Sequence, residues 1–139
     1  MLEARAVWKG RLAFDAWDGE GRPIALDASK AAGGGGDGFR PAELPLLGLA
    51  GCTGIDVIEI LAKMRQQVTG FEVRVTSKKK QGYPAGYDGI HIEYTVRGKG
   101  LAKEKVEQAV RLSEEKYCTV GQALRKATEI THAITIVEE

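Results

Sequence analysis

The feature that most constrains the fold of this chain is an apolar helical segment that begins near Pro41 and runs to about Gln67. Proline suits the first turn of a helix, and Glu43 complements the positive N-terminal end of the helix dipole. Six residues at helical spacing form one apolar stripe, namely Leu44, Gly48, Gly51, Ile55, Ile58 and Ala62. Because a single apolar helix needs a sheet to cover it, the sequence predicts a fold that combines helices with strands.

Three glycines recur at every third position in the first half of this segment, at Gly48, Gly51 and Gly54. Glycine inside a helix costs roughly 0.5–1 kcal/mol relative to alanine. One interpretation is that another backbone approaches this end of the helix closely. The alternative is that these are chance glycines in a frayed first half of the helix.

Short strands are predicted on both sides of the helix, from alternation of apolar and polar residues and from the turns between them. The predicted strands are residues 2–8, 11–17, 23–26, 71–76, 90–96 and 131–137, and the predicted later helices are residues 102–116 and 119–128. The glycine-rich residues 29–38 read as a flexible loop, and residues 78–87 as a long hairpin connection. The buried side of the first of these later helices is expected to hold Val106, Ala109, Val110, Ser113 and Tyr117. The order of elements predicts an α+β fold in a single domain over residues 1–139.

Charge and composition exclude several classes of protein. The chain has 20 Lys plus Arg against 19 Asp plus Glu, so its formal net charge is +1, which argues against electrostatically driven binding of nucleic acid. The N-terminal residues hold no apolar core of signal-peptide length, and no apolar run is expected to approach the roughly 20 residues that cross a bilayer. We therefore expect a soluble, cytoplasmic protein with no membrane partner, in which two cysteines stay reduced unless they react.

The two cysteines are the best candidates for chemistry. Cys118 stands directly before Thr119, and Thr119 with Gln122 forms a predicted capping box. A thiol at a helix N-terminus has a lowered pKa and is reactive as the thiolate, so Cys118 is predicted to be activated. Cys52 lies at the edge of the apolar stripe, where a buried cysteine is often only a small hydrophobic residue, and Asp56 one turn later opposes its ionisation.

Other residue patterns predict no further site. His91 and His132 have no metal-ligand spacing to the cysteines, so neither a metal nor a cofactor is expected. The glycine run at residues 33–38 lacks the Lys-Ser or Lys-Thr of a phosphate-binding loop. The basic residues 78–80 are interpreted as a solvated hairpin tip.

The sequences around both cysteines resemble those of a known family. The first motif is Pro41-Ala42-Glu43-Leu44 followed by Gly48-Leu49-Ala50-Gly51-Cys52-Thr53-Gly54-Ile55-Asp56-Val57, and the second is Leu112-Ser113-Glu114-Glu115-Lys116-Tyr117-Cys118-Thr119-Val120. They resemble the two motifs of the OsmC/Ohr family of osmotically induced and organic hydroperoxide resistance proteins, and most closely those of its YhfA-like branch.

The resemblance implies an OsmC-like fold, with antiparallel sheets around a long central helix, and an intertwined homodimer that brings Cys52 and Cys118 together at its interface. It also implies a thiol-dependent peroxidase of the oxidative or osmotic stress response. Cys52 would be oxidised by an organic hydroperoxide, Cys118 would resolve the sulfenic acid to a disulfide, and an external dithiol reductant would restore both thiols.

The chain departs from the family pattern at the start of the helix. The peroxidase members carry a glutamate directly after the opening proline, where this chain has Ala42, and Glu43 one residue later is rotated by about 100°. Their partner arginine lies in an N-terminal motif that this chain lacks, and Arg40 or Arg22 would have to replace it. The alternatives are a non-catalytic OsmC-like dimer that binds a small apolar ligand, and a redox sensor.

Overall fold

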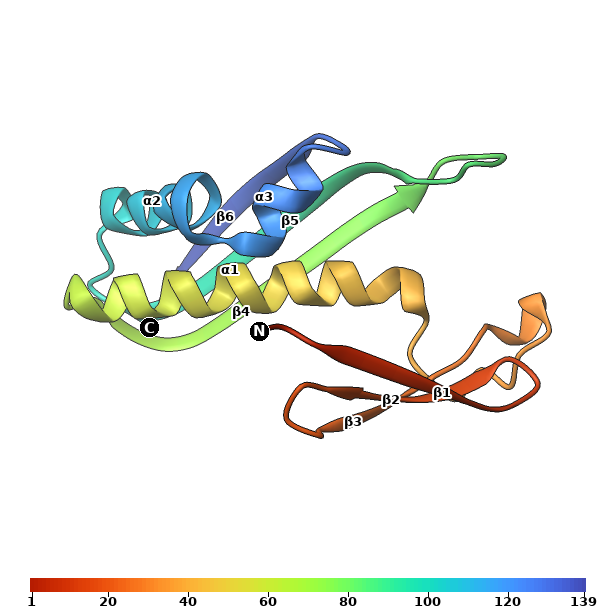
Figure 1. Ribbon diagram of the computed structural model, residues 1–139. Coiled ribbons are helices and arrows are strands. Elements are labelled where there is room, and N and C mark those ends of the chain that lie inside the picture. The colour runs from red at the N-terminus through yellow and green to blue at the C-terminus, as the bar shows by residue number, and fades with distance from the viewer. The chain divides into compact units, whose positions relative to one another are not determined.

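The computed structural model describes all residues from Met1 to Glu139 and divides the chain into two compact units, Met1–Pro45 and Leu46–Glu139. The mixture of helices, two small sheets and one long helix confirms the predicted α+β class (Figure 1). That the whole chain forms a single domain stays a prediction.

The N-terminal unit is built on a three-stranded antiparallel sheet in the order β1-β2-β3. Its strands are β1 (Ala4–Gly10), β2 (Ala13–Asp18) and β3 (Pro23–Leu26). The glycine-rich segment that follows contains a short 3-10 helix, Lys30–Ala32, and the Asp27 carboxylate accepts hydrogen bonds from the backbone N–H groups of Ala28 and Gly35. A Cβ at Gly34 would lie 2.2 Å from the carbonyl oxygen of Ala28. Residues 29–38 therefore form a loop, as predicted, but one that contains a short 3-10 helix and is organised by hydrogen bonds to Asp27.

The long helix is close to its predicted position. A 3-10 turn, Pro41–Glu43, leads into α1 (Leu44–Lys63), and the chain turns at Arg65, which has a φ of 58°, before the next strand begins at Gln67. The helix was predicted to end near Gln67, which is about one turn too late, because Gln67 is already the first residue of that strand.

The face of α1 that is buried within the chain differs from the predicted stripe. The buried residues are Leu49, Thr53, Val57 and Leu61, spaced four apart, whereas Ile55 and Ile58 are exposed. The sequence pattern did not reveal this face because it includes a polar residue, Thr53. The Thr53 hydroxyl can be buried because it donates a hydrogen bond to the Leu49 carbonyl at 2.8 Å. A Cβ built on Gly51 would have no atom within 4 Å, and a Cβ built on Gly54 would contact only the side chains of Val73 and Phe71. No other backbone segment of the same chain therefore approaches these two glycines.

The helical stretch Pro41–Lys63 is long and apolar enough to cross a membrane by length and composition. This corrects the expectation that no such run exists in the chain. The core helix of a soluble protein passes the same test, and this helix buries one side against the core of the C-terminal unit, so the finding assigns no membrane span.

The C-terminal unit holds a second sheet in the order β4-β5-β6, comprising β4 (Gln67–Lys79), β5 (Tyr87–Lys99) and β6 (Ile130–Glu138). β4 and β5 form an antiparallel hairpin, but β6 pairs with β5 in parallel, which differs from the expected all-antiparallel sheet. A parallel pair needs a crossover connection, and helices α2 (Lys103–Leu112) and α3 (Thr119–Arg125) supply it (Figure 1). The predicted alternation in β5 is confirmed, with Ile90, Ile92, Tyr94 and Val96 buried in the core.

Between α2 and α3 the chain makes one turn of π-helix, Ser113–Tyr117. The wider turn changes which side chains point inward, so Glu114 is buried and Tyr117 is half exposed. The predicted buried face is correct from Val106 to Ser113 and wrong at Tyr117. This turn ends at Cys118 and thereby sets the position of its sulfur.

Candidate active site

Cys52 lies in the third turn of α1 and is half-buried. It packs against the hydrophobic core of the C-terminal unit, next to the fully buried Thr53 on the same helix. The helix continues for three further turns beyond it, so its backbone is held rigidly. The arrangement leaves Cys52 partly exposed to solvent, in contrast to Thr53 beside it.

Cys118 lies at the N-cap of α3 and has no solvent exposure. Its sulfur accepts a hydrogen bond from the backbone N–H of Gly121 at 3.2 Å, and its own N–H donates to the Ser113 carbonyl at 2.8 Å. The capping residue is therefore Cys118, and the predicted Thr119–Gln122 capping box is wrong. The Gln122 amide instead donates to the Glu114 and Glu115 carbonyls of the π-turn.

The fold brings both cysteines of one chain to a single place. The sulfur of Cys52, the sulfur of Cys118 and a carboxylate oxygen of Asp56 all lie within 4.8 Å of one another, and both thiols are free. One Asp56 oxygen accepts a hydrogen bond from the Ser113 hydroxyl at 3.0 Å. Two sulfurs at this separation require only a further approach to form a disulfide bond of about 2.05 Å.

The environment of Cys118 opposes its ionisation. Burial, followed by the hydrogen bond with Cys52, raises the pKa of the Cys118 thiol to about 12, and the Asp56 carboxylate acts in the same direction. The Gly121 N–H lowers the pKa but does not prevail. The prediction that the helix N-terminus activates Cys118 is therefore wrong, because α3 is short and the sulfur is fully buried.

A buried carboxylate in the π-turn has no counterpart among the residues predicted from the sequence. Glu114 accepts a hydrogen bond from the Tyr94 hydroxyl at 2.8 Å, lies 3.0 Å from His132 Nδ1 and 3.7 Å from the Arg125 guanidinium. Arg125 also donates to the Glu114 carbonyl at 2.6 Å. Burial and the Glu114 charge raise the pKa of Tyr94, which keeps it a hydrogen-bond donor. These contacts join β5, β6 and α3 to the turn that ends at Cys118; a tyrosine on the apolar face of a strand was the one signal for them in the sequence.

Comparison with known proteins agrees with this geometry. Residues 34–133 match the family model described as OsmC-like protein. The chain is 37% identical over 136 residues to Protein YhfA of Escherichia coli strain K12, covering 98% of each chain. The chain belongs to the OsmC-like family.

Solved structures show the same fold. A hypothetical protein from Aquifex aeolicus VF5 is 28% identical, with a TM-score of 0.87 and coverage of 100% of this chain and 98% of that one. An organic hydroperoxide resistance protein OsmC from Legionella pneumophila is 17% identical, with a TM-score of 0.72 and coverage of 97% and 96%.

Two residues that the OsmC-like resemblance suggested, Arg40 and Glu43, belong to the N-terminal unit, whereas both cysteines belong to the C-terminal unit. The Arg40 guanidinium donates to the carbonyls of Gly36 and Gly38, and Glu43 is exposed in the 3-10 turn. Arg22, the other suggested arginine, pairs with Asp18 at 2.6 Å. The roles of Arg40 and Glu43 toward Cys52 stay predictions.

The two sulfurs and the Asp56 carboxylate are the place in this OsmC-like chain best suited to a metal. Two thiolates and a carboxylate are ligands that Zn²⁺ and Cd²⁺ accept, and their ligand atoms lie close enough to share an ion. His91 and His132 lie elsewhere, bonded to Thr131 and Glu114 respectively. Any such ion would occupy the thiols that redox chemistry needs.

Proposed function

We propose that this OsmC-like protein is a thiol-dependent peroxidase that reduces organic hydroperoxides through Cys52 and Cys118. The observation that carries the proposal is the approach of the two free sulfurs to within 4.8 Å, with one half-buried and the other fully buried. The Legionella relative is named an organic hydroperoxide resistance protein, which supports the class of substrate.

In the first step the Cys52 sulfur attacks the distal oxygen of the hydroperoxide. The O–O bond breaks, the alcohol leaves with a proton, and Cys52 becomes a sulfenic acid. Cys52 takes this role because it is the more accessible of the two thiols. Arg40 and Glu43 are the candidates for orienting the peroxide, as the family resemblance suggests.

In the second step the Cys118 sulfur attacks the sulfenic sulfur of Cys52. The S–S bond forms, the S–O bond breaks, and water leaves with the proton of Cys118. An external dithiol then returns two electrons and two protons to the pair. The high pKa of Cys118 keeps it a thiol during the first step, so the two sulfurs do not compete for the peroxide.

Consumption of cumene hydroperoxide with dihydrolipoamide as reductant tests this function. We expect Cys52→Ser to lose turnover, and Cys118→Ser to retain one-time formation of a sulfenic acid that dimedone traps at Cys52. Equal turnover in the wild type and in Cys52→Ser contradicts the proposal. Arg40→Lys and Glu43→Gln in the same assay report whether these two residues contribute.

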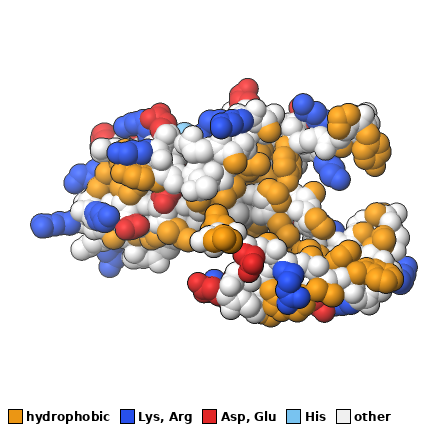
Figure 2. Space-filling view, viewed as in Figure 1, with side chains coloured by type: hydrophobic (Ala, Val, Ile, Leu, Met, Phe, Trp, Pro, Cys, Tyr) orange, Lys and Arg blue, Asp and Glu red, His pale blue; other side chains and the backbone are white.

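The proposal includes a homodimer that works in the cytoplasm under oxidative or osmotic stress. Support for the dimer comes from the exposed apolar face of α1, which includes Ile55 at 66% and Leu47 at 54% exposure. Such hydrophobic side chains are visible at the surface of each unit in Figure 2. Light scattering should report a dimer for the wild type and for Lys63→Glu at the exposed end of α1, and a monomer for Ile55→Glu.

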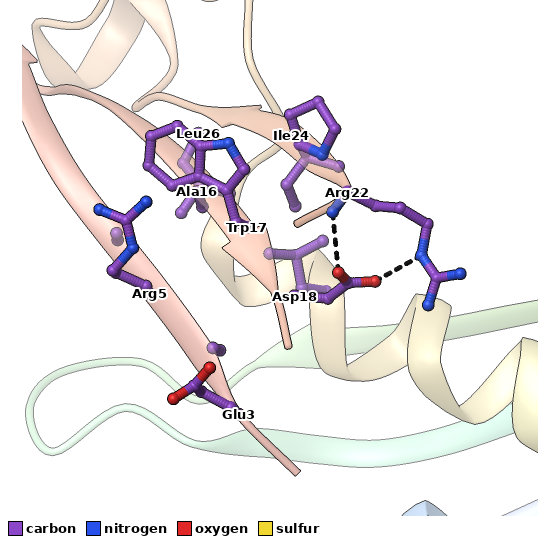
Figure 3. Close-up of a pocket in the computed structure, with 12 residues that line it drawn as sticks. Glu3, Arg5, Ala16, Trp17, Asp18, Arg22, Ile24 and Leu26 are labelled. Carbon is purple, nitrogen blue, oxygen red and sulfur yellow. Dashed lines mark hydrogen bonds and ion pairs between the residues drawn. The ribbon is translucent and has the colours of Figure 1, made fainter. Parts of the chain in front are cut away.

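A second candidate function, the binding of a small apolar ligand, is favoured by a hollow of about 430 Å³ in the N-terminal unit. Its wall includes Ala16, Ile24 and Leu26, and the Arg5 guanidinium lies 4.3 Å from the centre of the Trp17 ring (Figure 3). Arg22 closes one side through its hydrogen bonds to Asp18.

Tryptophan fluorescence distinguishes this candidate, because Trp17 lines the hollow and Trp8, the other tryptophan, does not. If the hollow binds a saturated fatty acid, titration changes the emission of the wild type and of Trp8→Phe but not of Trp17→Phe. An unchanged emission in all three variants removes this candidate.

A further inference from the structure

Asp56 is an ionisable side chain held close to both sulfurs. It follows Cys52 by one turn of α1, and one of its oxygens lies within 4.8 Å of both thiol sulfurs. Its carboxylate is fixed by the Ser113 hydroxyl, which donates to one oxygen at 3.0 Å. A sulfur and an oxygen at this separation can exchange a proton after a small side-chain rotation or through one water molecule.

The disulfide-forming step requires a proton acceptor at this place. Cys118 is fully buried, and a thiol without access to water stays neutral because burial disfavours the charged thiolate. Its attack on oxidised Cys52 must therefore release a proton inside the protein. A group that accepts this proton as the S–S bond forms lowers the barrier.

The other charged or titratable groups nearby are less suited to accept this proton. Glu59, Lys63 and Tyr117 share the surface hollow of about 460 Å³ that Asp56 lines, and Glu59 pairs with Lys63 at 3.3 Å. The Glu114 carboxylate is engaged by Tyr94 and His132. Asp56 alone has a carboxylate oxygen placed within 4.8 Å of the Cys118 sulfur together with that of Cys52.

We propose that Asp56, positioned by Ser113, accepts the proton of Cys118 as its sulfur attacks oxidised Cys52, and passes that proton to the leaving group. With a Cys52 sulfenic acid, the S–S bond forms, the S–O bond breaks, and the proton converts the leaving hydroxide to water. The inference rests on the proposed function only in that Cys52 is the thiol oxidised first. No arginine is required for this step.

Substituting Asp56 separates this role from a purely electrostatic one. A negative carboxylate disfavours the Cys118 thiolate, so Asp56→Asn should make Cys118 easier to ionise and, by charge alone, faster to react. If Asp56 is instead the proton acceptor, the same substitution makes disulfide formation slower. The two roles predict opposite signs.

A peroxide-free oxidant measures the step directly. Ellman's reagent, 5,5′-dithiobis(2-nitrobenzoate), reacts with Cys52 to form a mixed disulfide and release one thionitrobenzoate anion. The Cys118 thiol then attacks the Cys52 sulfur, forms the protein disulfide, and releases a second thionitrobenzoate and one proton. Mass spectrometry of Cys118→Ser, which stops after the first release, verifies that Cys52 carries the adduct.

We expect Asp56→Asn to slow the second release at least tenfold, Asp56→Glu to restore part of the rate, and Ser113→Ala to give an intermediate loss. Glu59→Gln, one turn further along the same exposed side of α1, serves as the matched control and should leave the rate unchanged. A second release that is equal or faster in Asp56→Asn, with the fold verified by circular dichroism, overturns the proposal. Should Asp56→Asn fail to fold, a second release in Ser113→Ala that is as fast as in the wild type overturns the proposal.

The outcome is distinct from that of the peroxidase test. If cumene hydroperoxide oxidises neither cysteine but the second release depends on Asp56, the proposed substrate fails and the role of Asp56 stands. If peroxide turnover depends on Cys52 but the rate of the second thionitrobenzoate release does not depend on Asp56, the peroxidase function is supported and the role of Asp56 is refuted.

Discussion

The surroundings of Cys52 and those of Cys118 differ in almost every physical respect. Cys52 is half-buried on a long regular helix and is held by apolar packing. Cys118 is fully buried at the end of a π-turn and is held by hydrogen bonds to Gly121 and Ser113 and by the Glu114 network nearby. The difference shows how one pair of identical side chains can be given two roles, since access favours the first attack and burial preserves a thiol for the second.

The difference also shows when a helix N-terminus fails to lower the pKa of a cysteine. Its electrostatic effect on a nearby group is typically worth about 0.3–1 kcal/mol, which is less than the penalty of burying a charge. At Cys118 burial prevails, and the pKa rises although a backbone N–H points at the sulfur. A sequence motif that places cysteine before a helix therefore does not by itself indicate a reactive thiolate.

The largest expected effect concerns alkylation by iodoacetamide at pH 8. With a pKa of about 12, only about one part in ten thousand of Cys118 is ionised, and we expect it to react on the order of a thousandfold more slowly in the folded protein than in urea. Peptide mapping by mass spectrometry gives the two rates separately, with Cys52 as the internal control. Comparable rates for Cys118 in folded and unfolded protein would refute the contrast drawn between the two sites.

Much of the fold was predictable from the sequence because alternation and turn residues act locally. The strand containing Ile90 to Val96 and the helix containing Val106 to Val110 follow the expected periodicity. The parallel pairing of β6 depends on how α2 and α3 return the chain, which no local pattern determines. The buried face of α1 was missed because a threonine with an internally bonded hydroxyl takes a core position at Thr53.

The site was predictable only in part. Both cysteines were found from their motifs, and Asp56 was noted as an opposing charge one turn from Cys52. Glu114 was not found, because a glutamate next to the exposed Glu115 reads as surface unless the π-turn that directs it inward is known. The pKa of Cys118 likewise depends on burial by residues distant in sequence, so it could not be read from the capping position.

The second prediction tests whether the Glu114 network holds the Cys118 side in place. Glu114→Gln keeps the shape but removes the charge that Arg125 and His132 face, and we expect a loss of about 1–3 kcal/mol in the free energy of unfolding in urea. Glu115→Gln, at the exposed adjacent position, should change stability by less than about 0.5 kcal/mol. Equal effects of the two substitutions would mean that the network contributes nothing specific.

The third prediction concerns alkaline pH. The pKa of Cys118 is raised on folding, so its contribution to stability is fully present below the unfolded value of about 8.5 and is lost as pH rises toward 12. The groups that face it are Cys52, whose thiol hydrogen bonds to it, Asp56, whose charge acts in the same direction, and Tyr94, whose own pKa is raised in part by Cys118. The melting temperature of the wild type should therefore fall more steeply between pH 8.5 and 11 than that of Cys118→Ala.

Tyr94 also has a raised pKa and contributes a loss of the same sign in this range, so Tyr94→Phe is the companion control. Replacing Cys118 should flatten the curve whether or not Tyr94 is present. Parallel melting curves for the wild type and Cys118→Ala would show that the buried thiol does not titrate on unfolding.

The smallest expected effect is at Gly121, whose N–H bonds to the Cys118 sulfur. A Cβ added there would lie 3.3 Å from that sulfur and 3.6 Å from Leu49 Cδ1, a tight fit that a shift of a few tenths of an ångström relieves. Alanine also favours the helix by about 1 kcal/mol over glycine, which offsets the crowding. We therefore expect Gly121→Ala to change the unfolding free energy by less than about 1 kcal/mol, while displacing the Cys118 sulfur and altering the second thionitrobenzoate release. An unchanged rate of that release would show that the pair tolerates displacement of Cys118, and that access to Cys52 matters more than the placement of its partner.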